Sequence, residues 1–339
     1  MRVIMADLKI TVSDILIRAG SPEDIAIIVA DSLVSAEAKG VRTHGIIRLG
    51  SYLDSIKDGS LTPDARPTVI SCKGSIINMN GNSGFGIYSA YVAANKSMRM
   101  SEENGISMIG MKNIHHMGML EYVTDMCATK GYIAISMSNG HPTVSAPEGK
   151  TRIIGTNPVS ISIPSLNRNF NLDFAISKTS FGAVRKSALE GTQLEKGLAV
   201  DASGNSTTDP MEAMNGSLIP FGGYKGFGLG LVVDLLAGIL TGSAAGTEVV
   251  TWNKLGKRWN NGFVIITINP DFFGNVWEFK NEVKRYILKL KEISPNASVP
   301  GEKRHAVLLD SIKNGILLDE TQMNTLTELS RYYGTTPKI

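Results

Sequence analysis

The segment Thr43-His44-Gly45-Ile46-Ile47-Arg48 sets an imidazole and a guanidinium four residues apart, soon after a glycine at position 40. If Thr43 caps a new helix, His44 and Arg48 lie one turn apart on the same face. Histidine is a natural general acid near neutral pH, and arginine is an always charged partner for carboxylates. The pair therefore predicts a site that holds a small carboxylate and protonates the carbon–oxygen group beside it. An ion pair on the surface is the alternative interpretation of this spacing.

A second candidate segment lies between an expected strand and an expected helix, where His115 and His116 are adjacent. Two neighbouring histidines in a loop, out of five in the whole chain, favour a functional role over a structural one. His116 is close to the small Gly118 and to the start of the helix, so we expect it to face a ligand. A metal site needs further ligands, and His141, the nearest candidate, has no spacing typical of one. No metal is predicted.

Three glycine-containing turns are further candidates: residues 155–158 (GTNP), 222–226 (GGYKG) and 299–304 (VPGEKR). Glycine lets the backbone approach a ligand closely, and the amine of Lys225 can reach a phosphate. Each turn by itself is more typical of ordinary chain reversal. Together with Asp173, an acid at the end of an expected strand, they indicate a site assembled from loops.

The common nucleotide-binding loops are absent from the sequence. No Gly-x-Gly-x-x-Gly follows an expected strand and opens a helix, because the glycines of residues 81–86 and 226–230 have the wrong spacing. The complete Walker motif, Gly-x-x-x-x-Gly-Lys-Ser/Thr, is missing as well. If the protein binds a nicotinamide cofactor, a Rossmann domain does not bind it.

Composition narrows the class of protein. The 339 residues, with 42% hydrophobic residues, 19% charged residues and 35 glycines, are typical of a globular α/β or α+β protein with two domains. A net charge of +3 without a run of five like charges argues against nucleic acid as a partner. The N-terminus reaches Asp7 before any long apolar stretch, unlike a signal peptide. The most apolar window, residues 227–240, is too short to span a membrane and is expected to be a buried core helix. We therefore expect a cytoplasmic protein without a membrane partner.

Helix and strand patterns are mixed without a strict βαβ rhythm. Ser21 is expected to cap a helix that has Pro22 at its first position and an apolar face over residues 25–36. A second helix follows His44 and ends at Gly59. Further helices are predicted over residues 88–104, 117–130, 276–293 and 319–333, the last with Asp319 as its cap, and strands over residues 106–111, 132–138, 159–163, 171–176 and 263–269.

Seven segments, in this order, resemble the malate/L-lactate dehydrogenase family, a group of NAD(P)-dependent oxidoreductases distinct from the Rossmann-fold lactate and malate dehydrogenases. The resemblance runs from about residue 20 to residue 335. It is carried by residues 43–48 (THGIIR), 113–118 (NIHHMG), 155–158 (GTNP), 172–175 (LDFA), 208–210 (TDP), 222–226 (GGYKG) and 299–302 (VPGE). Any one motif is weak, but seven in order over nearly the whole chain are specific.

The resemblance implies an α+β fold with two parts. An unusual non-Rossmann, NAD(P)-binding mixed sheet domain covered by helices is expected over residues 73–295. A helical domain formed by both chain ends is expected over residues 1–72 and 296–339. The family is typically dimeric, so we expect a homodimer with the dinucleotide at or near the subunit interface.

The resemblance also implies roles for single residues. His44 matches the family's proton donor, Arg48 its substrate-carboxylate clamp, and His116 a second active-site histidine, so the source of the proton stays open between the two histidines. Thr156 and Asn157 are expected at the substrate. The segments expected to contact the dinucleotide contribute Asp173, Phe174, Ala175, Tyr224, Lys225, Gly301 and Glu302.

The implied activity is reversible hydride transfer between NAD or NADP and a small 2-oxo acid, with oxaloacetate/L-malate first and pyruvate/L-lactate second. Other members act on cyclic imino acids, sulfolactate, diketo sugar acids or ureidoglycolate, and Arg48 does not discriminate among these carboxylates. Thr43, Met117, His141 and Glu148 differ from the residues common in the family, which leaves the substrate open. A ligand-binding module without catalysis is the remote alternative.

Overall fold

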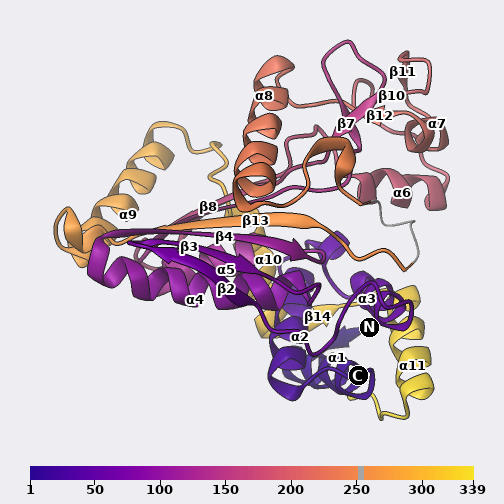
Figure 1. Ribbon diagram of the computed structural model, residues 1–339, viewed down its shortest axis with the longest axis horizontal. Coiled ribbons are helices and arrows are strands. Elements are labelled where there is room, and N and C mark those ends of the chain that lie inside the picture. Colours follow the sequence, from indigo (N-terminus) through magenta and orange to yellow (C-terminus); the bar gives the residue numbers. More distant parts are fainter. Residues whose placement is uncertain (251–255) are drawn as a thin grey trace.

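The computed structural model describes residues 1–250 and 256–339, and a seven-stranded mixed sheet lies at its centre (Figure 1). Its strands follow the order β2 (Thr68–Lys73), β3 (Ile76–Asn80), β4 (Ile106–Ile114), β13 (Asn261–Ile268), β5 (Ile133–Ser138), β8 (Val159–Ile163) and β9 (Phe170–Phe174). Strands β3 and β4 pair in parallel, because the helix α4 (Gly86–Asn104) crosses between them, and the other pairs of this sheet are antiparallel. This topology confirms the expected mixed, non-Rossmann sheet.

Two helices, α4 and α5 (Glu121–Thr129), cover one face of the sheet (Figure 1). Small side chains such as Ala134 and Ser136 of β5 are buried on this side, which lets the helices pack closely. The larger Ile135 and Met137 alternate with them and are only half-buried on the opposite face. The bulkier apolar side chains of β5 therefore point away from the helices that cover the sheet.

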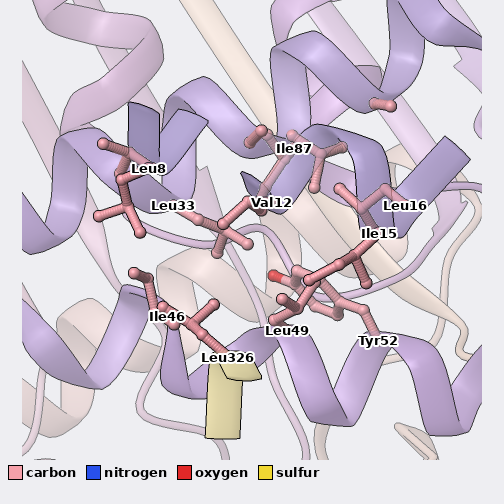
Figure 2. Packing of buried hydrophobic residues seen from close by; sticks show 14 of the residues in the cluster. Leu8, Val12, Ile15, Leu16, Leu33, Ile46, Leu49, Tyr52, Ile87 and Leu326 are labelled. Carbon is pink, nitrogen blue, oxygen red and sulfur yellow. The ribbon is translucent and has the colours of Figure 1, made fainter. Parts of the chain in front are cut away.

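Both ends of the chain meet in a helical layer beneath the sheet (Figure 1). The layer contains α1 (Met5–Arg18), α2 (Glu23–Ala38), α3 (Ile47–Lys57), α10 (Glu302–Asn314) and α11 (Glu320–Tyr333). The short strand β1 (Arg2–Val3) pairs with β14 (Ile316–Leu317), and Figure 2 shows Leu8, Leu33, Ile46 and Leu326 in one shared core. The seven-stranded sheet begins at Thr68, inside the range of residues 1–72 that was expected for the helical domain.

A five-stranded sheet that the sequence did not predict lies at the other end of the molecule. It follows the order β11 (Ser206–Thr207), β10 (Ala199–Val200), β12 (Ser217–Leu218), β6 (Val144–Ser145) and β7 (Arg152–Ile154), flanked by α6 (Phe181–Glu190) and α7 (Pro210–Asn215). Strands of two or three residues are too short to show an alternating pattern. They form here because their apolar side chains share one core with both helices.

The apolar window expected as a buried helix is instead largely exposed on its outer side. The helical segment that includes this window consists of α8 (Tyr224–Val233), the π-helical turn η2 (Asp234–Gly238) and the 3-10 turn η3 (Ile239–Thr241). Leu235 and Ile239 are 54% and 61% exposed. The helical stretch from Tyr224 to Thr241 is long and apolar enough to cross a membrane by those two criteria, which ordinary core helices also meet.

Most predicted elements are present, with informative differences at their ends. The helix α9 (Val276–Ile293) and strand β8 have the predicted bounds, and Asp319 caps α11 in a capping box. The helix predicted from residue 117 begins only at Glu121, because residues 115–120 form a loop with Gly118 at φ +66°. Ser21 is not a cap, since α2 starts after Pro22 without a side-chain hydrogen bond. The remaining short helices are η1 (Arg42–His44), η4 (Gly246–Glu248) and η5 (Pro270–Phe272).

Candidate active site

The predicted helix over His44 and Arg48 is wrong. Residues Arg42–His44 form the 3-10 turn η1, Gly45 leaves helical geometry at φ −87° and ψ −145°, and α3 begins at Ile47. Thr43 therefore caps no helix. It joins the two candidate residues instead, because its carbonyl oxygen accepts a hydrogen bond from Nε of Arg48 at 2.7 Å and its Oγ1 lies 3.0 Å from Nδ1 of His44.

A buried glutamate from α2 supports this turn from below. Glu37 is 3% exposed, and its Oε2 accepts the backbone N–H of Ile46 at 3.1 Å. Its Oε1 accepts Nε2 of Gln322, which comes from α11, at 2.8 Å. A Cβ at position 45 would collide with this carboxylate, so the turn requires Gly45. Sequence reasoning missed Glu37, since its partners lie 9 and 285 residues away.

His44 and His116 come together across the fold. Their rings stack with centroids 5.7 Å apart and planes 17° apart. Both side chains keep some exposure to solvent, but the protein around them excludes most of the water. This burial, and next the positive charge of Arg48, lowers the pKa of His44 to about 3 and holds the pKa of His116 well below its usual value. Both imidazoles are therefore neutral near pH 7 in the absence of a ligand.

The protonation pattern of His116 follows from its neighbours. The backbone N–H of Gly118 donates to Nδ1 of His116 at 3.2 Å, and the hydroxyl of Tyr52 lies 2.9 Å from the same atom. A backbone N–H can only donate, so Nδ1 is an acceptor. The single proton of the neutral ring is consequently assigned to Nε2. His116 thus presents an N–H donor to the site.

Arg48 brings a positive charge that has no counter-ion among the described residues. No acidic side chain of the described residues acts on its guanidinium, which is half-buried and shares its surroundings with Tyr52 and Arg185. A partly desolvated cation without an anionic partner costs free energy in the folded state. The position is therefore suited to an anionic ligand.

His115, the other histidine of the pair, has a packing role. Its ring is 2% exposed and stacks on Trp259 with centroids 4.1 Å apart. Its Nε2 lies 3.2 Å from Oγ of Ser55. The two neighbouring histidines thus separate into one buried ring and one that faces the site.

Asp173, expected to contact the dinucleotide, belongs to a buried ionic cluster. Its Oδ2 accepts Nη1 of Arg304 and the backbone N–H of Glu121, both at 3.3 Å. Burial raises the pKa of Asp173 to about 6 against the opposing effect of Arg304. Arg304 also contributes to lowering the pKa of His44, which places the cluster beside the catalytic candidates. Sequence reasoning did not select Arg304, because its acidic partners lie 131 and 183 residues away.

The turn expected at the substrate holds loops together. Asn157 is fully buried at φ +34°, its Oδ1 accepts the N–H of Gly140 at 3.1 Å, and its Nδ2 donates to the carbonyl of Gly230 at 2.8 Å. The carbonyl of Thr156 accepts the N–H of Ile176 at 2.8 Å. Asn157 thereby fixes the loop that follows β5.

The residues expected at the dinucleotide are spread over three places. Phe174 and Ala175 line an apolar cavity of about 630 Å³, whose wall also contains Leu172, Ser177, Lys178, Leu198 and Phe221. Gly301 lines a separate polar cavity of about 330 Å³, and Glu302 next to it binds Nζ of Lys291 at 2.7 Å. Tyr224 is 74% exposed at the start of α8, beside the exposed Lys225. The described residues contain no group of three or more histidine, cysteine or acidic side chains placed to hold a metal.

The chain is similar to known proteins over nearly its whole length. A family model described as malate/L-lactate dehydrogenase matches residues 3–327. The chain is 32% identical over 311 residues to the malate/(S)-sulfolactate dehydrogenase of Methanothermus fervidus, an alignment that covers 92% of each protein. It is 32% identical over 333 residues to the malate dehydrogenase of Pyrococcus abyssi, with 94% of this chain and 91% of that protein covered.

A solved structure supports the same conclusion. The malate dehydrogenase of Entamoeba histolytica superposes with a TM-score of 0.94 at 28% identity and covers 99% of both chains. The match extends over the helical layer and both sheets rather than over one of them. The chain belongs to the malate/L-lactate dehydrogenase family, whose members are nicotinamide-dependent oxidoreductases that act on hydroxy acids.

Proposed function

We propose that the protein transfers a hydride reversibly between NAD(P)H and a small 2-oxo acid, with oxaloacetate/L-malate as the first choice and pyruvate/L-lactate as the second. The observation that carries this proposal is Arg48, which has no acidic partner among the described residues and lies beside the stacked rings of His44 and His116. Arg48 binds the carboxylate of the substrate, and the histidines face the oxygen on the neighbouring carbon.

The cofactor fits the apolar cavity at the end of β9. Phe174 and Phe221 meet edge to face there, with ring centroids 5.6 Å apart, and can pack against a planar ring. Gly222 and Gly223 stand at φ +56° and +61° before α8, which leaves the helix N-terminus and Lys225 open to a phosphate. The nicotinamide ring supplies the hydride when the cofactor is bound.

His44 is the residue that exchanges the proton. Nδ1 of His116 is occupied by the N–H of Gly118, so the cationic form of His116, with a proton on both nitrogens, would place two donors against each other. Among the described residues, Nδ1 of His44 has the hydroxyl of Thr43 as its hydrogen-bond partner, and a hydroxyl can either donate or accept. His44 can therefore gain and lose a proton without breaking a contact. His116 keeps its proton and donates a hydrogen bond from its Nε2–H to the substrate oxygen.

A substrate panel tests the proposal. Purified protein is mixed with NADH or NADPH and with oxaloacetate, pyruvate, sulfopyruvate or a cyclic imino acid, and the nicotinamide absorbance is followed. We expect oxaloacetate to be reduced faster than the others. Binding of NADH without turnover of any substrate would contradict the proposed reaction and favour a ligand-binding module. Comparing the two cofactors at equal concentration also decides between NAD and NADP.

We further propose a homodimer. The chain exposes 15857 Å², roughly 2,400 Å² more than a compact monomer of 36.4 kDa is expected to expose. None of the 18 residues of α9 is buried, although Trp277 and Ile293 are apolar, and Leu235 and Ile239 are exposed beyond α8. An obligate dimer buries an area of this order on each subunit.

Light scattering after size-exclusion chromatography tests the oligomeric state. Leu235→Glu should produce monomers, whereas Leu189→Glu, at a leucine that is 80% exposed on α6, should leave the dimer intact. A monomeric wild-type protein at micromolar concentration would contradict the proposal.

A further inference from the structure

The polar cavity of about 330 Å³ lies where β9 begins and is lined by residues of α5, α9 and α10. Its volume is within the range of small-ligand pockets, roughly 300–1,000 Å³. Two of its lining residues each have a buried polar atom without a hydrogen-bond partner within the described residues: Nη1 of Arg168 and Oδ1 of Asn171. Asn171 is only 9% exposed. Buried polar atoms are rarely left unpaired, so an unpaired donor and an unpaired acceptor in one cavity indicate a ligand that satisfies both.

The two carboxylates that line the cavity are already engaged. Oε1 of Glu121 accepts Nζ of Lys39 at 2.8 Å, and Oε2 accepts Nη1 of Arg304. Oδ2 of Asp125 accepts Nζ of Lys39 at 2.9 Å, and its Oδ1 accepts Nδ2 of Asn171 at 3.0 Å. Every oxygen of both carboxylates therefore has a donor within the protein.

Arg168 and Lys280 bring the unused positive charge of the cavity. No salt bridge within the described residues involves either of them, whereas Lys39 is paired with Glu121. Three cationic and two acidic side chains line the cavity, so its walls carry one net positive charge. Burial lowers the pKa of His305, which lines the cavity as well, so its ring is neutral near pH 7. The free charges therefore favour an anionic group.

Glu302, next to Gly301 of the cavity wall, is held by another cation. Its Oε2 accepts Nζ of Lys291 at 2.7 Å. This hydrogen bond is the main cause that lowers the pKa of Glu302, and the charge of Arg168 is the least of the causes. Glu302 is thus the partner of Lys291, and Arg168 stays available for a ligand.

Strand β9 connects the polar cavity with the candidate active site. Asn171 and Asp173 are two residues apart, so their side chains lie on the same face of the strand, about 7 Å apart. Asp173 accepts Nη1 of Arg304 in the ionic cluster beside the catalytic candidates. Phe174, at the other end of the strand, lines the apolar cavity that takes the nicotinamide ring under the proposed function. A dinucleotide that lies along β9 with its ring at this end has its adenosine end at the polar cavity.

We propose that the polar cavity binds the adenosine ribose of the cofactor, that Arg168 and Lys280 bind a phosphate on its 2′-oxygen, and that the protein therefore prefers NADPH to NADH. This inference rests on the proposed function and specifies the cofactor that it leaves open. The guanidinium fork of Arg168 suits a phosphate, and Oδ1 of Asn171 accepts the neighbouring ribose hydroxyl. A site for NAD instead uses a carboxylate that accepts the 2′-hydroxyl, and both carboxylates here are bound to Lys39.

Adenosine fragments test the subsite without the reaction. Calorimetric titration of the full chain with 2′,5′-ADP and with 5′-AMP compares two ligands that differ in the 2′-phosphate. We expect 2′,5′-ADP to bind about tenfold or more tightly, because hydrogen bonds between charged groups are gained, and Arg168→Gln to remove most of that difference. Arg168→Lys keeps the charge and should keep part of the difference. Arg99→Gln, at an exposed arginine of α4, is the matched control and should change the affinity for neither ligand.

The whole cofactors are then compared by fluorescence titration. We expect the wild type to bind NADPH more tightly than NADH, and Arg168→Gln to weaken binding of NADPH while it leaves binding of NADH unchanged. Equal affinity of the wild type for the two cofactors would overturn the inference, and so would a preference for NADPH that Arg168→Gln leaves intact. Binding of 2′,5′-ADP that NADPH does not displace would place a free phosphorylated ligand in the cavity and would also overturn the assignment to the cofactor.

Failure of the subsite and failure of the proposed function give different results. If the protein reduces no 2-oxo acid, a preference for 2′,5′-ADP that Arg168→Gln removes still supports the subsite and contradicts only the reaction. If oxaloacetate is reduced with equal kcat/KM for NADH and NADPH, the subsite is wrong and the proposed reaction stands.

Discussion

At the scale of single residues, the candidate site combines neutral histidines with Arg48, a cation that has no acidic partner among the described residues. His44 and His116 are kept uncharged by burial and by Arg48, so no internal ion pair has to break before an anion binds. The proposed roles of the two rings differ although the rings stack on each other, because the N–H of Gly118 donates to Nδ1 of His116. These roles lead to two predictions at this scale.

The first prediction separates the two histidines. His44→Gln should lower kcat at least about a hundredfold and leave the affinity for NADH unchanged, because glutamine cannot exchange a proton. His116→Gln should lower kcat less, because its amide can still donate a hydrogen bond to the substrate oxygen. Steady-state kinetics and a separate NADH titration measure both effects. A larger loss of kcat in His116→Gln than in His44→Gln would contradict this assignment.

The second prediction concerns the pKa of His44, which burial and then Arg48 and Arg304 lower to about 3. An anion on Arg48 cancels part of the repulsion, so the pKa of His44 should rise when malonate binds. Titration of the imidazole signals by NMR, with and without malonate, measures the shift. Arg48→Gln is the matched control: its His44 should start at a higher pKa and shift less. A pKa that does not move in the wild type would refute the coupling.

At the scale of elements, three helices determine where His44 stands. Glu37 of α2 accepts the N–H of Ile46 at the start of α3, and Gln322 of α11 donates to the same carboxylate. Arg42 of the turn lies 3.7 Å from Glu37 as well. The C-terminal helix therefore reaches the candidate catalytic turn through the buried carboxylate of Glu37, whose pKa is raised by that burial, and its cap Asp319 also lies 3.7 Å from Arg42.

The third prediction exchanges the partners in this contact. Glu37→Gln should lower stability by about 1–3 kcal/mol and reduce kcat, because its amide can accept from only one of two donors and leaves the other unpaired. The double variant Glu37→Gln/Gln322→Glu restores a donor–acceptor match and should recover at least half of the loss. Thermal unfolding and kcat are measured for the wild type and for both variants. A double variant no better than the single one would show that the contact does not support the turn.

At the scale of the whole molecule, four buried or half-buried histidines link stability to pH. Burial lowers the pKa of His44 and His115 to about 3 and the pKa of His141 to about 4. It also holds the pKa of His116 well below its usual value. In the unfolded chain these groups titrate near 6.5, so below that pH the unfolded state binds more protons than the folded state. Asp173 opposes this trend, because its folded pKa of about 6 lies above the unfolded value.

The fourth prediction is a loss of stability as the pH falls from about 6.5 towards 4. Each histidine contributes a slope of at most about 1.4 kcal/mol per pH unit, and four histidines outweigh Asp173, Glu37 and Asp234, the carboxyl groups whose pKa burial raises. Calorimetric Tm values at several pH values between 7.5 and 4.5 measure the slope. His115→Phe keeps a ring against Trp259 but cannot titrate, so its slope should be shallower. A Tm that stays constant from pH 6.5 to pH 5 would contradict the prediction.

The sequence by itself determined which residues are candidates for the site and where most of the long helices and strands lie. Residue type and spacing predicted His44 and Arg48 as a proton donor and a carboxylate clamp, with a surface ion pair as the alternative. The bounds of α9 and β8 followed from local sequence patterns. Local rules also predicted that Asp319 caps α11. These features depend on neighbours in the chain, so they can be predicted without the fold.

Only the tertiary structure decided how the site is assembled. The expected helix that would align His44 and Arg48 does not exist, because Gly45 must pass above the buried Glu37 and the chain forms a 3-10 turn there. Glu37 and Arg304 became candidates for positioning the site through contacts with residues distant in the chain. Burial and the contacts between distant segments set the charge state of a side chain, and neither is encoded in local spacing.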